Sequence, residues 1–217
     1  MDRSNVFDAV SSSDVRNGEG ARAFQASGAA RLKASPSFVG RTLTLATMRT
    51  MLRPVVPADV PALHALWADP DVRRFLWDDE CIGEERAAEV VAASGADFAA
   101  HAFGFWTVYE TASGQFMGFC GLRPSEAGEP ELLFGFWPRY WGQGLATEAS
   151  RAVLSYAFDV LACPHVVAAT DVPNAASART LERLGMQIER RGTLNGRDTL
   201  FYRLPRERFQ QLGRPLA

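Results

Sequence analysis

The sequence predicts an α/β protein built on a mixed sheet, with helices packed on its faces. Two observations carry this prediction. Between residues 103 and 137, three short segments rich in aromatic and apolar residues follow one another, separated by turn residues, as consecutive antiparallel strands are. From residue 138 on, helical and strand-like segments alternate, which is typical of sheets that carry helices on their faces.

In the first part of the domain, the sequence predicts one strand followed by helices. The expected elements are a strand at 42–53, a helix that begins near residue 60, a short helix at 72–76 and a helix at 84–94. Pro54 ends the strand, because proline cannot donate to a strand ladder. Asp59 is a plausible N-cap and Pro61 a suitable first-turn residue of the helix that follows. Gly95 is expected to end the last of these helices.

In the second part of the domain, the sequence predicts six strands and two further helices. The strands are expected at 103–110, 115–122, 131–137, 165–171, 186–192 and 199–204, and the helices at 146–161 and 175–184. Turn residues at 113–114 and the dipeptide Asn195-Gly196 mark two hairpins. Gly185 stands where a left-handed residue commonly closes a helix.

The chain has 217 residues, slightly more than one domain at about 150 residues per domain. Residues 1–40 contain seven serines and seven alanines and show no sustained helical or strand period. We therefore expect a flexible N-terminal extension at 1–40 and one folded domain at 41–217. The alternative for the extension is an arm that binds a partner or a second copy of the chain.

Charge and cysteine usage exclude several classes of protein. The net charge of −2 gives no basic field for nucleic acid, and no run of 18 apolar residues predicts a membrane span. Cys81, Cys120 and Cys163 are odd in number and form no C-x-x-C pair. We expect reduced, buried thiols, a cytoplasmic location and no metal site.

A glycine loop between a strand and a helix is the first chemical signal. Gly142 and Gly144 let the backbone turn tightly just before a helix, whose first amides are unpaired and carry partial positive charge. Such a junction suits a phosphate or pyrophosphate. The expected donors are the amides of Gln143, Gly144, Leu145 and Ala146. The third glycine of a dinucleotide loop is absent, because residue 147 is threonine. The alternative is a junction with a purely geometric role.

A second signal follows the strand at 165–171. Asn174 is a natural N-cap of the next helix, and Ser177 stands in its first turn. Either both residues only cap the helix, or they also present polar atoms to a ligand.

These two signals, in this order, resemble the GNAT superfamily of N-acetyltransferases. Arg139, Gly142 and Gly144 match its R/Q-x-x-G-x-G/A motif for the coenzyme A pyrophosphate. The string from Tyr140 to Ala149 is similar to the YWGxGxATEA of the RimJ/RimL-like branch, and Asn174 with the residues up to 186 is similar to its NxxSxxxxEKLGF. The resemblance covers residues 43–209.

The resemblance implies the GNAT fold, with a mixed, mostly antiparallel central sheet of six to seven strands and helices on both faces. It implies an N-acetyltransferase that uses acetyl-CoA as cosubstrate and transfers the acetyl group directly to a primary amine. That amine would be a protein N-terminus or a small molecule, and the enzyme could pair as a homodimer. The alternative is a non-catalytic acyl-CoA-binding or regulatory module, because the tyrosine that many members carry near the end of this helix is replaced by Leu181.

The resemblance also implies roles for individual residues. The expected coenzyme A contacts are Phe136, Trp137, Arg139, Gly142, Gln143, Gly144, Leu145, Ala146, Thr147, Asn174 and Ser177. With Leu181 in place of the tyrosine, Ser177 is the expected proton donor to the leaving thiolate. Glu131 is the first candidate for the general base, Glu148 is its rival, and Asp171 or a water molecule is the third option.

The acceptor side is expected among the N-terminal helices and nearby aromatic residues. Trp77 and Trp106 are the expected substrate contacts, with Asp171. The stretch from Trp77 to Glu80 places three carboxylates beside an indole, which suits a cationic amine. The alternative is a solvated acidic loop beside core aromatics.

Overall fold

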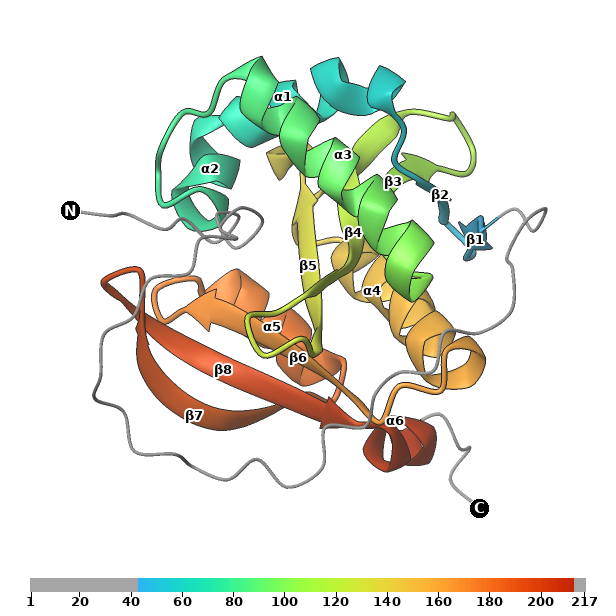
Figure 1. Cartoon of the computed structure of the whole chain (residues 1–217), viewed down its shortest axis with the longest axis vertical. Coiled ribbons are helices and arrows are strands. Elements are labelled where there is room, and N and C mark those ends of the chain that lie inside the picture. The colour runs from blue at the N-terminus through green and yellow to red at the C-terminus, as the bar shows by residue number, and fades with distance from the viewer. Residues whose placement is uncertain (1–42, 213–217) are drawn as a thin grey trace.

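The computed structural model describes residues 43–212, so the extension expected at 1–40 lies outside the described residues. The strands form one sheet in the order β1-β2-β3-β4-β5-β6-β8-β7 (Figure 1). The strands are β1 (Leu45–Ala46), β2 (Thr50–Pro54), β3 (Phe105–Glu110), β4 (Phe116–Pro124), β5 (Pro130–Phe136), β6 (His165–Asp171), β7 (Gln187–Leu194) and β8 (Arg197–Pro205). Every neighbouring pair is antiparallel except β5 and β6. The predicted mixed sheet is confirmed, with eight strands instead of six to seven.

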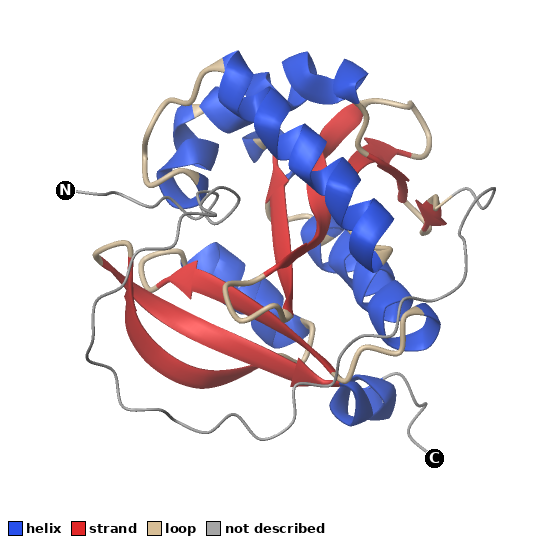
Figure 2. Cartoon of the chain, viewed as in Figure 1, coloured by secondary structure: helices blue, strands red, loops and turns tan. Residues whose placement is uncertain are grey.

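Helices cover both faces of the sheet, as predicted (Figure 2). They are α1 (Val60–Ala68), α2 (Pro70–Leu76), α3 (Glu84–His101), α4 (Leu145–Ser155), α5 (Ala175–Arg183) and α6 (Arg206–Leu212). Side chains on β4 and β5 alternate between two hydrophobic clusters. Phe119 and Leu133 pack with α1–α3, whereas Cys120 and Leu132 pack with α4 on the other face.

Three predicted elements differ in the structure. The expected strand at 42–53 is a hairpin, because Thr47 and Thr50 exchange hydrogen bonds across a turn between β1 and β2. Asp59 precedes α1 but does not cap it; its carboxylate binds Arg53 instead. The expected helix at 146–161 is α4 followed by a five-residue π-helical turn, Tyr156–Val160.

The helix expected at 84–94 continues through Gly95 to His101. Glycine costs a helix about 1 kcal/mol relative to alanine, which tertiary packing can outweigh. Here Val90 and Val91 are buried, and the Ser94 hydroxyl accepts a 2.7 Å hydrogen bond from the Phe105 backbone. The actual end is Ala102, which takes the left-handed conformation with φ of 61°.

The one parallel pair sets the shape of the sheet's centre. β5 follows β4 in unbroken register from Gly118 and Phe136 to Pro124 and Pro130. Between β5 and β6, by contrast, a single register pair joins Glu131 to Val167. Beyond this bridge the two strands diverge, and the sheet opens at its middle.

Gly118 lets β4 and β5 approach each other closely. A Cβ at this position would lie 2.1 Å from the Gly135 carbonyl oxygen and 2.8 Å from the Phe136 Cα. We expect Gly118→Ala to lower the free energy of unfolding by about 1–3 kcal/mol, because backbone must move to admit the methyl group. Urea denaturation measures this change.

Gly95 provides the control, because a Cβ there would have no atom within 4 Å. Gly95→Ala should raise the free energy of unfolding by about 0.5–1 kcal/mol through helix propensity. A Gly118→Ala protein as stable as the wild type would contradict the close approach of β4 and β5.

Candidate active site

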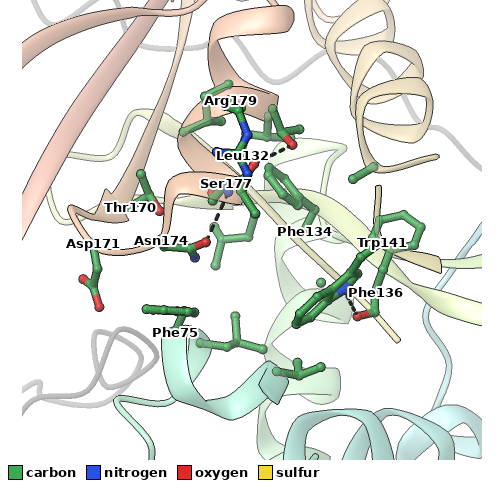
Figure 3. Close-up of a pocket in the computed structure, with 18 of the residues that line it drawn as sticks. Phe75, Leu132, Phe134, Phe136, Trp141, Thr170, Asp171, Asn174, Ser177 and Arg179 are labelled. Carbon is green, nitrogen blue, oxygen red and sulfur yellow. Dashed lines mark hydrogen bonds between the residues drawn. The ribbon is translucent and has the colours of Figure 1, made fainter. Parts of the chain in front are cut away.

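A cleft of about 330 Å³ occupies the opening between β5 and β6 (Figure 3). Its walls come from α2, β5, the glycine loop, the start of α4, the end of β6 and the first turns of α5. Ten predicted site residues line it: Glu131, Phe136, Gly142, Gly144, Leu145, Ala146, Thr147, Asp171, Asn174 and Ser177.

The backbone of β5 presents polar groups to this cleft. Antiparallel pairing directs the amides and carbonyls of alternate residues toward the partner strand. The Trp137 N–H donates to the Met117 carbonyl at 3.0 Å, which continues the ladder with β4. The N–H and C=O of Phe134 and Phe136 therefore point the other way, where β6 has moved out of reach.

This pattern corrects the predicted roles of Phe136 and Trp137. The Trp137 N–H is used by β4, and the Phe136 carbonyl accepts a 2.7 Å hydrogen bond from the Trp141 indole (Figure 3). Trp137 does not line the cleft. The groups that face the cleft are the Phe136 N–H and both backbone groups of Phe134, a residue that the sequence analysis did not single out.

The glycine loop stands at the wide end of the cleft. Gly142 and Gly144 have φ of 74° and 76°, a conformation that glycine adopts without strain. The first amide to bond within α4 is that of Glu148, which donates to the Gly144 carbonyl at 3.0 Å. The amides of Leu145, Ala146 and Thr147 precede it, so they have no acceptor within the helix. Leu145 and Ala146 are two of the four predicted donors, and Thr147 joins them; that an anion binds to these amides stays a prediction.

Two predicted coenzyme contacts in this loop brace it from outside the cleft. The Gln143 side chain donates to the Arg139 carbonyl at 2.9 Å. The Arg139 guanidinium lies over the rings of Trp137 and Tyr140, at 5.3 and 4.9 Å from their centres. Neither Gln143 nor Arg139 lines the cleft.

Glu148 does not fit the predicted role of general base. One carboxylate oxygen accepts from the Thr47 hydroxyl at 2.6 Å and the Arg49 amide at 2.8 Å, and the other accepts from the Arg49 guanidinium at 2.6 and 2.7 Å. Burial alone would raise the pKa of Glu148, but these hydrogen bonds outweigh it and lower the pKa. Glu148 lies outside the cleft and anchors the turn between β1 and β2 to α4.

Arg49 is a residue of this region that the sequence did not reveal. Its guanidinium binds Glu148 and also donates to the Gln143 carbonyl at 3.0 Å. It therefore fixes the peptide that precedes Gly144. Its position in sequence, almost a hundred residues before the loop, offers no local signal of this contact.

Asn174 and Ser177 combine the two roles that the sequence left open. The Asn174 side-chain oxygen accepts from the Ser177 amide at 3.2 Å and so caps α5. Both residues also line the cleft (Figure 3). Within residues 43–212, the Asn174 amide nitrogen and the Ser177 hydroxyl make no hydrogen bond, so they are available to a ligand.

The two candidate bases that line the cleft are both paired with arginines. Glu131 is bound by Arg123 of the neighbouring strand β4, at 2.8 and 2.9 Å. Asp171, at the end of β6, is bound by Arg197 at 3.3 Å. Burial, aided by the nearby charge of Asp78, raises the pKa of Asp171 although Arg197 opposes it.

The aromatic residues of the expected acceptor side fall into two groups. Trp77 and Trp106 are fully buried, and the Trp106 indole donates to the Leu43 carbonyl at 2.7 Å. Neither lines the cleft, so the structure does not support direct substrate contacts for them. Phe75 of α2 and Asp78 do line the cleft, so one aromatic and one acidic residue of the expected acceptor side lie at the site.

Charge is distributed unevenly along the cleft. Arg179 and Arg183 line it from α5, whereas Asp71, Asp78 and Asp171 line it near α2 and the end of β6. Figure 3 shows Arg179 on the far side of the cleft from Phe75 and Asp171. One end of the cleft therefore suits an anion and the other a cation.

The three cysteines are free thiols. Cys120 and Cys163 are buried as predicted, but Cys81 is exposed. In the part of the chain that the structure describes, no helix is long and apolar enough to cross a membrane. Nor do His, Cys, Asp or Glu side chains of this part gather in threes that could hold a metal ion.

Comparisons with known proteins point to one family. A family model for an acetyltransferase (GNAT) domain matches residues 49–187. The YkkB protein of Bacillus subtilis (strain 168) is 29% identical over 150 residues, which cover 67% of this chain and 86% of that protein. The FsC-acetyl coenzyme A-N(2)-transacetylase of Aspergillus fumigatus is 28% identical over 153 residues, which cover 66% of this chain and 64% of that protein.

A solved structure shares the fold. The ribosomal-protein α-N-acetyltransferase RimL, in complex with coenzyme A, superposes with a TM-score of 0.64 at 17% sequence identity. The match covers 75% of this chain and 97% of RimL. Together, the family model and the acetyltransferase relatives define the class of this protein as an acyltransferase. The chain belongs to the GNAT acetyltransferase family, as the sequence predicted.

The anchoring role of Glu148 predicts an acid-sensitive contribution to stability. We expect Glu148→Gln to lower the free energy of unfolding at pH 7 by about 1–2 kcal/mol, a modest value because Arg49 is half exposed. Since folding lowers the pKa of Glu148 from its ordinary 4.5, its contribution is present above pH 4.5 and is lost as the pH falls through the folded value. The difference between variant and wild type should therefore shrink in acid.

Chemical denaturation at several pH values measures this difference. Glu89→Gln is the matched control, because Glu89 forms an exposed pair with Arg86 on α3 and should change stability by about 0.5 kcal/mol or less. A Glu148→Gln variant with wild-type stability at pH 7 would contradict the anchor.

Proposed function

We propose that this protein is an acetyl-CoA-dependent N-acetyltransferase that transfers the acetyl group directly to a primary amine. The observation that carries the proposal is the divergence of β5 and β6, with the first amides of α4 at the wide end. GNAT acetyltransferases use acetyl-CoA and act on amine acceptors, and this cleft has groups that fit both substrates.

The cosubstrate fits the unpaired groups of the cleft. The amides of Leu145, Ala146 and Thr147 suit its pyrophosphate, because they combine free donors with the positive end of a helix. The backbone groups of Phe134 and Phe136 suit the amides of its pantetheine arm, which would replace the missing neighbour strand. The Asn174 side-chain nitrogen can donate to the same arm from across the cleft.

The chemistry needs a donor for the thioester oxygen and a proton source for the sulfur. The N–H of Phe134 or Phe136 supplies the first, as a fixed dipole directed into the cleft. Ser177 supplies the second, because its hydroxyl faces the cleft. Leu181 cannot substitute for the tyrosine of many relatives, since it is an apolar core residue that is 1% exposed.

The acceptor belongs at the end of the cleft formed by α2 and β6. Phe75 offers an apolar wall, and Asp78 and Asp171 offer negative charge, which suits an amine that arrives as an ammonium ion. The motifs of the glycine loop and of α5 favour the RimJ/RimL-like branch. The free cysteines fit a reducing compartment, so we place the reaction in the cytoplasm.

Release of free thiol from acetyl-CoA tests the proposal. The protein is mixed with acetyl-CoA and a panel of amines: spermidine, lysine, an aminoglycoside, and peptides with free Ser, Ala or Met N-termini. Amine-dependent thiol release, with a product heavier by one acetyl group, is expected for at least one of them. Tight coenzyme A binding without thiol release for any amine would favour a binding module.

Substitution of Gly144 tests the anion cradle. We expect Gly144→Asp to lower coenzyme A affinity at least about 100-fold, because it adds a negative charge beside the pyrophosphate and strains a residue with φ of 76°. Gly144→Asn has nearly the same shape without the charge and should retain more affinity. Isothermal titration with coenzyme A measures both.

Gly114→Asp is the control for backbone strain, because Gly114 has φ of 69° in the turn between β3 and β4, where a Cβ meets no atom within 4 Å. Its coenzyme A affinity should equal that of the wild type. Wild-type coenzyme A affinity in a folded Gly144→Asp protein would show that the pyrophosphate does not bind at this loop.

A further inference from the structure

Asp171 occupies a distinctive position in the cleft. The bridge between β5 and β6 pairs Glu131 with Val167, and four residues further along each strand stand Gly135 and Asp171. Asp171 thus lies at the level of the two cleft-facing amides that flank Gly135, those of Phe134 and Phe136. Its side chain is 15% exposed and points toward Phe75 across the acceptor end (Figure 3).

Segments far apart in sequence converge on Asp171. Arg197 of β8 binds Asp171 at 3.3 Å and Asp78, which follows α2, at 3.0 Å. The same guanidinium donates to the Arg74 carbonyl, and Asn195 donates to Asp78, both at 3.4 Å. Two carboxylates therefore share one arginine, and the group keeps a net negative charge toward the cleft.

We propose that Asp171 is the general base that deprotonates the acceptor amine, and that Arg197 and Asp78 are positioning residues that set its proton affinity. This inference rests on the proposed N-acetyltransferase function. The residual negative charge attracts the ammonium form of the acceptor, and the carboxylate then removes its proton, directly or through one water molecule.

Glu131 is less suited to this task. It stands where β5 and β6 are still bridged, at the closed end of the cleft. One of its oxygens receives two hydrogen bonds from Arg123, and the two side chains are 12% and 15% exposed. Glu131 therefore lies away from the end of the cleft that Phe75, Asp78 and Asp171 line, and one of its oxygens is already engaged by Arg123.

Several groups around Asp171 act on its pKa, which lies above its ordinary value. Burial raises its pKa, Arg197 opposes this, and Asp78 raises it further. The Thr199 hydroxyl of β8 also faces it and opposes the rise. The other charged groups that line the same cleft are Asp71 of α2, Glu131 of β5 and Arg179 and Arg183 of α5.

The proton and electron balance is complete. Asp171 takes one proton from the ammonium ion, and the freed lone pair forms the new C–N bond to the acetyl carbon. The C–S bond breaks and the sulfur leaves with its electron pair. The second nitrogen proton reaches the sulfur by way of the Ser177 hydroxyl, and Asp171 releases its proton to solvent.

The first test replaces the base. With the amine of the panel that gives the fastest thiol release, Asp171→Asn should lower kcat by about 10²–10⁴-fold, and acceptor KM should rise as well because a charge that attracts the ammonium ion is lost. Coenzyme A affinity and the thermal midpoint should remain near the wild-type values, which separates loss of the base from loss of the fold. A kcat within about threefold of the wild type would overturn the proposal.

The second test uses the two neighbours, whose removal should act in opposite directions. The acid limb of kcat/KM reports the pKa of the base in the free enzyme. Arg197→Gln removes a cation and should move this limb to higher pH, with partial return in Arg197→Lys. Asp78→Asn removes a like charge and should move it to lower pH. A purely structural role would not produce opposite shifts.

Asp198→Asn is the matched control, because Asp198 follows Arg197 on β8 but pairs with Arg191 on the edge strand β7. It should leave kcat and the acid limb unchanged. An acid limb that stays in place in both Arg197→Gln and Asp78→Asn would overturn the assignment even if the enzyme is active. Absence of acetyl transfer by the wild-type protein would instead refute the proposed N-acetyltransferase function.

Discussion

The backbone groups between β5 and β6 are the constraint on which the rest of the structure depends. A sheet normally pairs every interior strand, because an unpaired N–H or C=O away from water is costly. Here one bridge between Glu131 and Val167 is followed by divergence, so the centre of the sheet holds unsatisfied groups. Such a gap persists only if neighbouring elements prevent the strands from closing and if a ligand can use what is left open.

Ion pairs hold the gap at both ends. At the closed end, Arg123 binds Glu131, while Glu129 accepts from His165 and from Arg203. At the wide end, Arg197 ties the β7–β8 hairpin to the loop after α2. The glycine loop has its own support in the contact of Arg49 with Glu148. Arg123 and Glu131 join the neighbouring strands β4 and β5, whereas the other pairs join segments distant in sequence and so help to fix the relative position of those segments.

Local signals in the sequence predicted most of the elements and the main cleft residues. β6 and the start of α5 were expected at their observed positions, because alternation and an N-cap at Asn174 are properties of neighbouring residues. The errors arose where distant contacts decide. Gly95 does not end α3, because Ser94 next to it is held by its hydrogen bond with Phe105. Glu148 does not fit the role of general base, because Thr47 and Arg49 bind its carboxylate. Trp77 and Trp106 illustrate the same limit, since an aromatic residue gives no local sign of whether it lies in the core or in a cleft.

The uneven charge of the cleft has a consequence for turnover. In the proposed mechanism an amine enters as a cation, attracted by Asp78 and Asp171, but the amide formed from it carries no charge at that nitrogen. The reaction therefore removes the electrostatic attraction that bound the acceptor, and the product binds more weakly than the acceptor at that end of the cleft. At the opposite end, Arg179 and Arg183 line the cleft, and the phosphates of the proposed coenzyme would keep their charge throughout. The proposed mechanism therefore implies that the neutral amide product is held less tightly than the coenzyme, which keeps its charge.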